Sequence, residues 1–289
     1  MSDYRDVTAI LNPPPANKIG DGFRVHNFTP DGYKIDLDPF YLIDYNACIN
    51  VAACNKQLGV HSHPHRGLES VTLVYYGAIE HLDSAGNTGI INAGEVEWTT
   101  AGRGILHKEI YESEFSKNGG PLQLVQLWVN LPAAHKLCPP KYQPIKRKDM
   151  GRYELANNLG CIEVIAGNYS GIDGPAETFT DIEMYNGRLN KGALVNFKFL
   201  NHHNTALLVL EGDIIINEAH PIKANQMVYF KPGDGKISVR ATTNCIILLL
   251  SGAPINEPIV QFGPFLMNNN EELEKAILDY NYGEFGYLS

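Results

Sequence analysis

Short, strand-like stretches rich in apolar residues recur along the chain about every ten residues. They include SVTLVYY (70–76), LVQLWVN (124–130), CIEVIAG (161–167), ALVNFKF (193–199), ALLVLEG (206–212) and CIILLL (245–250). Gly, Pro, Asn and Asp separate these stretches, as in DSAGNTG (83–89) and KPGDG (231–235). Such spacing is typical of antiparallel sandwiches and barrels rather than of βαβ units. We therefore expect an all-β protein.

A weak internal repeat predicts two domains. LVYYGAIEH (73–81) resembles LVLEGDIII (208–216), and AGEVEWTTAGRGILHKE (93–109) resembles ANQMVYFKPGDGKISVRA (224–241) in its order of turn, apolar pair, Gly-x-Gly and strand. The proline-rich segment CPPKYQPIKRKD (138–149) lies between the two copies. We expect tandem β-barrel domains over residues 1–140 and 141–289.

One helix is expected, near the end of the second domain. Residues 269–283 begin with asparagines that can cap a helix and acidic residues that favour its first turn. Leu273, Ala276, Ile277 and Tyr280 then recur at helical spacing. These positions predict a helix that packs one apolar face against a barrel.

Composition narrows the class of protein. The chain has 289 residues and a formal net charge of −9, which argues against direct nucleic-acid binding. Its five cysteines are odd in number and form no CxxC pair, which fits a reducing compartment. No secretory signal is visible, and the longest apolar run (245–250) is too short to span a bilayer. We expect a cytoplasmic protein, with the nucleus also open for a eukaryotic chain, and no membrane partner.

Two histidine-containing motifs point to a metal site. In HSHPHRGLES (61–70), His63 and His65 stand at alternate positions, so a strand would direct both to one face. In GRGILHKEIY (102–111), His107 and Glu109 have the same spacing. Two such pairs on neighbouring strands would direct three imidazoles and one carboxylate into one pocket. That donor set suits a divalent first-row metal such as Fe, Mn, Co, Ni, Cu or Zn.

Spacing alone leaves two assignments open. His61 shares the parity of His63 and His65, but it lies where the strand is only starting. The same parity continues to Glu69, which therefore competes with Glu109 for the role of carboxylate ligand.

A family resemblance bears on both questions. The residues that carry it are HPHRGLES through ILHKE (63–109), LQLVQLWVNLP (122–132), PPKYQ (139–143) and FGPFLMNNNEELEKAILDYNYGEFG (262–286). Together they resemble the pirin family of two-domain cupins. The resemblance implies two tandem cupin domains, each an antiparallel β-barrel or jelly roll, with a C-terminal helix.

The resemblance also implies a ligand set. In pirins the metal is usually iron, Fe²⁺, and the matching positions here are His63, His65, His107 and Glu109. Glu69 then becomes a neighbour of the ligands in the pocket, and His61 has no counterpart among them.

The second domain is expected to lack a metal. Aligned with the first, it places Lys198 and Leu200 where His63 and His65 stand, and Ser238 and Arg240 where His107 and Glu109 stand. We expect this domain to be cupin-like without metal ligands.

Four protein ligands on a six-coordinate metal leave about two positions open for substrate and O2. The resemblance includes quercetin 2,3-dioxygenases, which implies a dioxygenase acting on a flavonol-type or other small aromatic, enolic or phenolic substrate. Glu109 or Glu69 would accept the substrate proton. The alternative is an iron-dependent regulator that binds a transcription factor or metabolic enzyme. A closed structural zinc site is least expected, because no cysteine lies in either motif.

Overall fold

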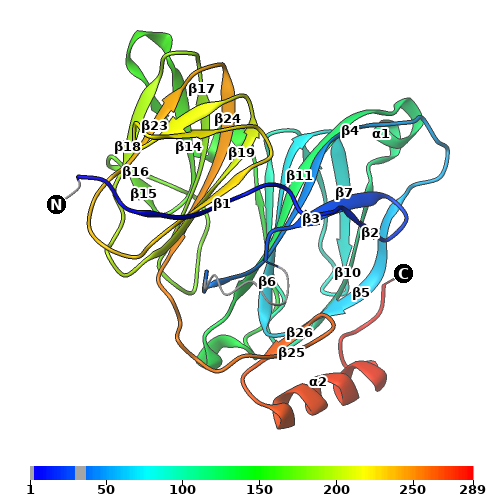
Figure 1. The fold of residues 1–289 in the computed structure, drawn as a ribbon. Coiled ribbons are helices and arrows are strands. Elements are labelled where there is room, and N and C mark those ends of the chain that lie inside the picture. The colour runs from blue at the N-terminus through cyan, green and yellow to red at the C-terminus, as the bar shows by residue number, and fades with distance from the viewer. Residues whose placement is uncertain (1–2, 30–36, 289) are drawn as a thin grey trace. The chain divides into compact units, whose positions relative to one another are not determined.

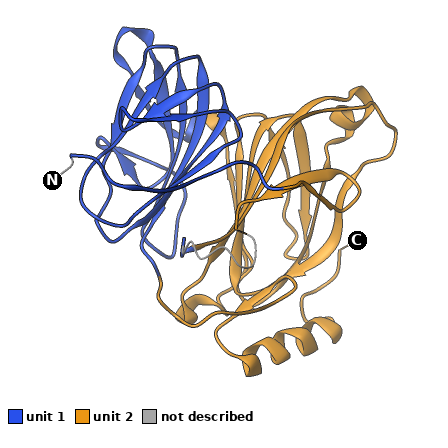
Figure 2. Cartoon of the chain, in the orientation of Figure 1, with its two compact units in different colours: residues 1–14, 31–39, 148–254 blue, residues 15–30, 40–147, 255–289 orange. Residues whose placement is uncertain are grey.

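The computed structural model describes residues 3–29 and 37–288, which form mainly β-strands (Figure 1). The chain divides into two compact units (Figure 2). Among the described residues, one unit comprises 15–29, 40–147 and 255–288 and is called the first barrel. The other comprises 3–14, 37–39 and 148–254 and is called the second barrel.

Two antiparallel sheets build the first barrel. The larger has the order β12-β9-β6-β11-β4-β3-β2, and the smaller has the order β5-β10-β7-β8. The strands of the larger sheet are β2 (Asn17–Ile19), β3 (Phe23–Asn27), β4 (Phe40–Val51), β6 (Leu68–Tyr76), β9 (Val96–Thr100), β11 (Gly120–Asn130) and β12 (Lys141–Ile145). Those of the smaller are β5 (Gly59–His65), β7 (Ala78–Asp83), β8 (Thr88–Asn92) and β10 (Ile105–Tyr111). A short helix α1 (Ser113–Asn118) and a 3-10 turn (Ala133–His135) flank β11.

The second barrel repeats this plan. Its larger sheet has the order β1-β22-β19-β24-β17-β14-β13, and its smaller sheet has the order β18-β23-β20-β21. The larger sheet contains β1 (Val7–Leu11), β13 (Gly151–Glu154), β14 (Gly160–Ala166), β17 (Ile182–Leu189), β19 (Asn204–Glu211), β22 (Met227–Phe230) and β24 (Cys245–Gly252). The smaller contains β18 (Leu194–Phe197), β20 (Ile214–Ile216), β21 (His220–Ile222) and β23 (Ile237–Ala241), and a separate hairpin joins β15 (Asn168–Tyr169) to β16 (Ile172–Asp173). Two further 3-10 turns span Arg147–Asp149 and Ala156–Asn158.

The order of strands confirms the internal repeat. The run β9-β6-β11-β4 of the first barrel corresponds to β22-β19-β24-β17 of the second, and β5-β10-β7-β8 corresponds to β18-β23-β20-β21. The two segments that resemble each other in sequence therefore occupy equivalent places in two barrels. The expectation of an all-β protein with two barrel domains is confirmed.

The domain bounds differ from the continuous ranges expected from sequence, 1–140 and 141–289. Strand β1 pairs with β22, in the second barrel. The segment after residue 254 belongs to the first barrel and contains β25 (Val260–Phe262), β26 (Phe265–Met267) and α2 (Asn270–Asn281). The physical reason is contact between segments that are distant in the sequence. Strand β1 pairs with an edge strand of the second barrel, and α2 packs on an apolar face of the first barrel. Local sequence patterns do not reveal such contacts.

Helix α2 forms as expected. The Asn269 side chain accepts a hydrogen bond from the Glu272 backbone amide at 2.9 Å, which caps the first turn. Leu273 and Ala276 are buried and pack with Phe265 and Phe285. Within residues 3–29 and 37–288, no helix is long and apolar enough to cross a membrane.

The two barrel interiors are filled differently. In the second barrel, one continuous apolar cluster includes Val195, Phe197, Ile237 and Val239, from the strands equivalent to β5 and β10. In the first barrel, the corresponding cluster consists of Phe23, Val25, Val74, Ile79, Ile91, Tyr111, Leu122 and Leu124. Histidines and carboxylates occupy positions on the equivalent strands of the first barrel, and they form the candidate site.

Candidate metal centre

Strands β5 and β10 bring the three predicted histidine ligands together. They pair antiparallel, with His63 opposite His107 and His65 opposite Ile105. The ring centroids of His63, His65 and His107 lie 4.3–4.9 Å apart. One ring nitrogen from each can be chosen so that all three lie within 4.8 Å of one another. A cluster of this kind can hold a metal ion.

Several nitrogens of the cluster lack protein partners. The Nδ1 atom of His65 and both ring nitrogens of His107 are buried and have no hydrogen-bond partner. A buried polar atom without a partner costs free energy, which a metal ligand bond removes. His63 differs, because its Nδ1 lies 2.8 Å from the His61 carbonyl oxygen and can donate to it, which leaves Nε2 for a metal. The residues therefore fit a metal.

Electrostatics keep the buried imidazoles neutral. Burial, and then the neighbouring His63, lower the pKa of His65 well below its usual value. Burial, followed by His63, His65 and His81, lowers the pKa of His107 in the same way. A histidine must be neutral to coordinate a metal, so both rings are in the binding form at neutral pH.

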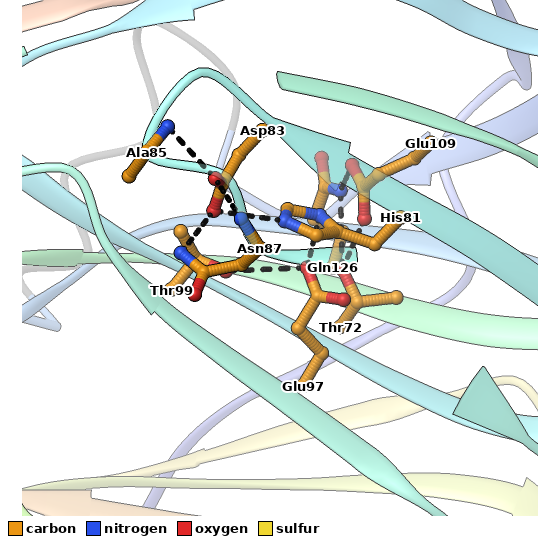
Figure 3. Close-up of polar contacts among 9 residues, drawn as sticks. All are labelled: Thr72, His81, Asp83, Ala85, Asn87, Glu97, Thr99, Glu109 and Gln126. Carbon is orange, nitrogen blue, oxygen red and sulfur yellow. Dashed lines mark hydrogen bonds and ion pairs between the residues drawn. The ribbon is translucent and has the colours of Figure 1, made fainter. Parts of the chain in front are cut away.

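Glu109 lies next to the cluster but is turned toward other groups. A bulge between His107 and Glu109 shifts the register with β5. The Glu109 carboxylate accepts hydrogen bonds from Thr72 Oγ1 at 2.6 Å and from Gln126 Nε2 at 2.5 Å (Figure 3). The structure thus brings together three of the four predicted ligands, and the role of Glu109 as the fourth stays a prediction.

Glu69 does not join the cluster. It lies three residues before Thr72 on β6, whose pairing with β9 is regular from Glu69 to Leu73, so the two side chains point to opposite faces. Its carboxylate accepts a hydrogen bond from Thr100, and burial raises its pKa to about 7. The parity that linked His65 to Glu69 in the sequence is broken at Gly67, where φ is 76° and the chain passes from one sheet to the other.

His61 also lies outside the cluster. It belongs to β5 rather than to a loop, and its side chain is exposed. Its Nε2 lies 3.6 Å from an Asp21 carboxylate oxygen.

A charged network that was not predicted from the sequence lies next to His107. His81 on β7 stands between Asp83, at 3.3 Å, and Glu97 on β9, at 2.8 Å (Figure 3). Burial alone would lower the pKa of His81, but hydrogen bonds to Asp83 and Glu97 raise that pKa to about 10. Tyr142 stacks on its ring. A sequence signal existed, because His81 and Asp83 share the inward parity of Ile79.

A cavity reaches Glu109 from the interior of the first barrel. Its space of about 350 Å³ is not enclosed, because it includes open solvent. Its polar lining consists of Glu109, Thr72, Gln126 and Asp44, and its apolar lining of Ile19, Phe23, Val25, Val60, Ile79 and Leu124. Asp44 Oδ1 is buried without a hydrogen-bond partner, and burial raises the pKa of Asp44 to about 6. Apolar walls with a few polar groups are typical of a small-molecule site.

In the second barrel, the register between β18 and β23 corrects one alignment. Ser238 lies opposite Asn196, and β18 ends at Phe197. Asn196, rather than Lys198, therefore takes the place that His63 has in the first barrel. Among the described residues, groups of three potential ligands close enough to share an ion occur only in the first barrel.

Comparison with known proteins agrees with this geometry. The pirin model matches residues 22–129, and the model of the pirin C-terminal cupin domain matches residues 184–286. Human pirin is 32% identical over 293 residues, covering 99% of this chain and 96% of its own. The chain belongs to the pirin family.

Further relatives agree with this assignment to the pirins. Pirin-1 of Arabidopsis thaliana is 37% identical over 278 residues, covering 93% of this chain and 91% of its own. A solved quercetin 2,3-dioxygenase from Acinetobacter baumannii is 38% identical, with a TM-score of 0.94, covering 99% of this chain and 100% of that one. The two barrels are therefore cupin domains, and the expected family and fold are confirmed. The pirin fold places the candidate metal site in the first of them.

Proposed function

We propose that this pirin is a metal-dependent dioxygenase that opens a flavonol-type, quercetin-like or related enolic or phenolic substrate with O2. The observation that carries the proposal is the three-imidazole cluster of His63, His65 and His107, with His107 two residues along β10 from Glu109, which lines the apolar pocket. The similarity to the Acinetobacter baumannii quercetin 2,3-dioxygenase supports the reaction class.

Iron(II) is the metal we propose, although Mn, Co, Ni, Cu or Zn suit the same donors. His63, His65 and His107 would hold it, with one carboxylate oxygen of Glu109 as the fourth ligand. When bound, the metal supplies Lewis-acid chemistry toward a substrate oxygen and redox chemistry toward O2.

The chain's own groups have distinct tasks in this scheme. The Glu109 carboxylate accepts the proton of an enolic or phenolic hydroxyl that enters the cavity. Thr72 and Gln126 donate to that carboxylate and fix its orientation. Glu69 points to the opposite face of β6, so we assign the proton-accepting role to Glu109 alone.

The cavity accounts for the substrate class. Its apolar side chains favour a flat, largely apolar molecule. Asp44 Oδ1, buried without a partner, lies on β4 opposite Gln126 and can accept a hydrogen bond from a second hydroxyl of such a molecule. Polyphenols combine these two properties.

The test is oxygen uptake by iron-loaded protein, prepared without oxygen and mixed with a panel of flavonols. We expect uptake coupled to loss of the flavonol and release of carbon monoxide, and no uptake by the His107→Ala variant. Stoichiometric iron without uptake across the panel would overturn the proposal. No observation on the described residues specifically favours the regulatory alternative, so it is not proposed.

A further inference from the structure

His107 belongs to two groups of potential ligands. One contains His63 and His65, and the other contains His81 and Glu97. In each group, the three chosen atoms lie within 4.8 Å of one another. Both ring nitrogens of His107 are buried and have no hydrogen-bond partner. An imidazole has two nitrogens on opposite sides of its ring, so it can serve a metal with one and a hydrogen-bond acceptor with the other.

Glu97 has an oxygen free to be that acceptor. Its side chain is fully buried. The Oε1 atom lies 2.8 Å from His81 Nδ1 and accepts from Thr99 Oγ1 at 3.2 Å, whereas Oε2 is buried and makes no hydrogen bond of standard geometry. The Tyr142 hydroxyl also lies near this carboxylate. A buried carboxylate oxygen without a donor is costly, and so is a buried imidazole N–H without an acceptor.

The network of His81, Asp83 and Asn87 holds Glu97 in place. His81 Nε2 lies 3.3 Å from Asp83 Oδ2, and Asp83 in turn accepts from the Asn87 side chain at 2.8 Å and from the backbone amides of Ala85 and Asn87 at 2.9 Å each (Figure 3). These contacts anchor the network in the turn between β7 and β8. Glu97 is therefore held at a fixed position beside His107 by contacts that leave its second oxygen available.

We infer that Glu97 is a positioning residue for His107. Its Oε2 accepts the N–H of the ring nitrogen that faces away from His63 and His65, which fixes the tautomer and ring plane and directs the other nitrogen to the metal. The inference rests on the metal site of the proposed function, but not on the reaction proposed there.

The side chains of His81, Glu97 and His107 could instead form a second cation site, but the hydrogen bonding of His81 argues against that alternative. Both ring nitrogens of His81 face carboxylate oxygens, Nδ1 that of Glu97 at 2.8 Å and Nε2 that of Asp83 at 3.3 Å, and a nitrogen that donates to a carboxylate has no lone pair to give a metal. The group of His81, Glu97 and His107 is therefore better matched to hydrogen bonding than to coordination.

The test compares Co²⁺ binding by the wild-type protein, Glu97→Ala, Glu97→Gln and the control Glu95→Gln. The control removes a carboxylate two residues away that pairs with Lys146 instead. We expect Glu97→Ala to raise the Kd for Co²⁺ about 10- to 100-fold. Glu97→Gln retains a neutral acceptor, so its loss should be only about 3- to 10-fold. Glu95→Gln should bind as the wild type does.

A spectroscopic measurement separates positioning from a general loss of structure. Proton NMR of the Co²⁺ protein should contain a shifted, exchangeable N–H signal from His107. That signal should move in Glu97→Gln and exchange much faster with water in Glu97→Ala. Thermal unfolding of the metal-free proteins checks that each variant is folded. If Glu97→Ala does not fold, the comparison of Glu97→Gln with the wild type still tests the inference.

Two results would overturn the inference. One is wild-type affinity together with an unchanged N–H signal in Glu97→Ala. The other is a second equivalent of Co²⁺ in the wild type that Glu97→Ala removes, since that would establish a second cation site. The failure of the proposed function can be told apart from the failure of this inference. If Glu97→Ala weakens Co²⁺ binding but the iron protein takes up no oxygen, the reaction is rejected and the positioning role of Glu97 is retained.

Discussion

His107 lies directly opposite His63 on paired antiparallel strands, and their ring centroids are 4.3 Å apart. The register of β5 against β10 therefore determines whether the metal site exists. A slip of one residue would turn one of the two side chains to the opposite face of the sheet. Metal binding at this candidate site would accordingly report on that register.

Replacing single histidines should separate the ligands from their neighbour. His63→Ala and His107→Ala each remove a nitrogen from the cluster and should abolish stoichiometric binding of iron, measured by elemental analysis. His61→Ala should bind a full equivalent, because His61 is exposed and faces Asp21. Equal loss of metal in all three variants would contradict the ligand assignment.

Substitution of the two candidate carboxylates should have unequal effects on catalysis. Glu109→Gln removes the proposed base and fourth ligand, so the kcat for oxygen uptake should fall about 10²- to 10⁴-fold. Glu69→Gln is the matched control and should change kcat by less than about threefold, since Glu69 points to the opposite face of β6. Rates are measured with iron content determined for each sample. A large loss in Glu69→Gln alone would reverse the assignment.

Metal retention should extend below the usual titration range of histidine. Burial lowers the pKa of His65 and of His107, so both rings stay neutral, and able to coordinate, at pH values below about 6.5. Protonation then competes with the metal only at lower pH. Dialysis against buffers from pH 8 to pH 4, followed by elemental analysis, should give a midpoint of metal loss below 6.5. A midpoint above that value would show that the site is not buried in solution.

Asp44 should limit stability at neutral pH. Burial raises its pKa from 3.8 to about 6, so the folded state binds its proton more tightly than the unfolded state. The free energy of unfolding from this group falls as pH rises from about 4 to 6 and is level above, with an upper limit of about 3 kcal/mol. Asp44→Asn should remove that penalty. Urea unfolding of both proteins at pH 4 and 7.5 should give a difference that grows with pH, and a constant difference would contradict this account.

Local sequence patterns predicted much of the site. Alternation identified β5 and β10, and helix α2 was marked by Asn269 and by Leu273 and Ala276. The pairing of His63 with His107 followed once the two strands were taken as neighbours, because parity fixes the direction of each side chain.

Parity failed where the chain left the sheet. The rule that alternate residues share a face was applied from His65 to Glu69 across Gly67. The positive φ of Gly67 interrupts the strand, so Glu69 was assigned to the wrong face. The contact between Glu97 and His81 could not be predicted from the sequence either, because it depends on which strands face each other across the barrel. The places of β1 and α2 depend on pairing between distant segments, about which a local pattern carries no information.

The exchange of chain ends between the barrels has a consequence for biosynthesis. Strand β5 ends beside Arg66, whose carbonyl accepts from the Leu266 amide and whose guanidinium binds Asp279 at 2.8 Å. Both partners lie in residues 255–288, which the ribosome makes after every strand of the second barrel. The barrel that holds the candidate metal site is thus completed last. Until α2 has been made, the residue that follows the two β5 histidines of the cluster lacks both of these contacts.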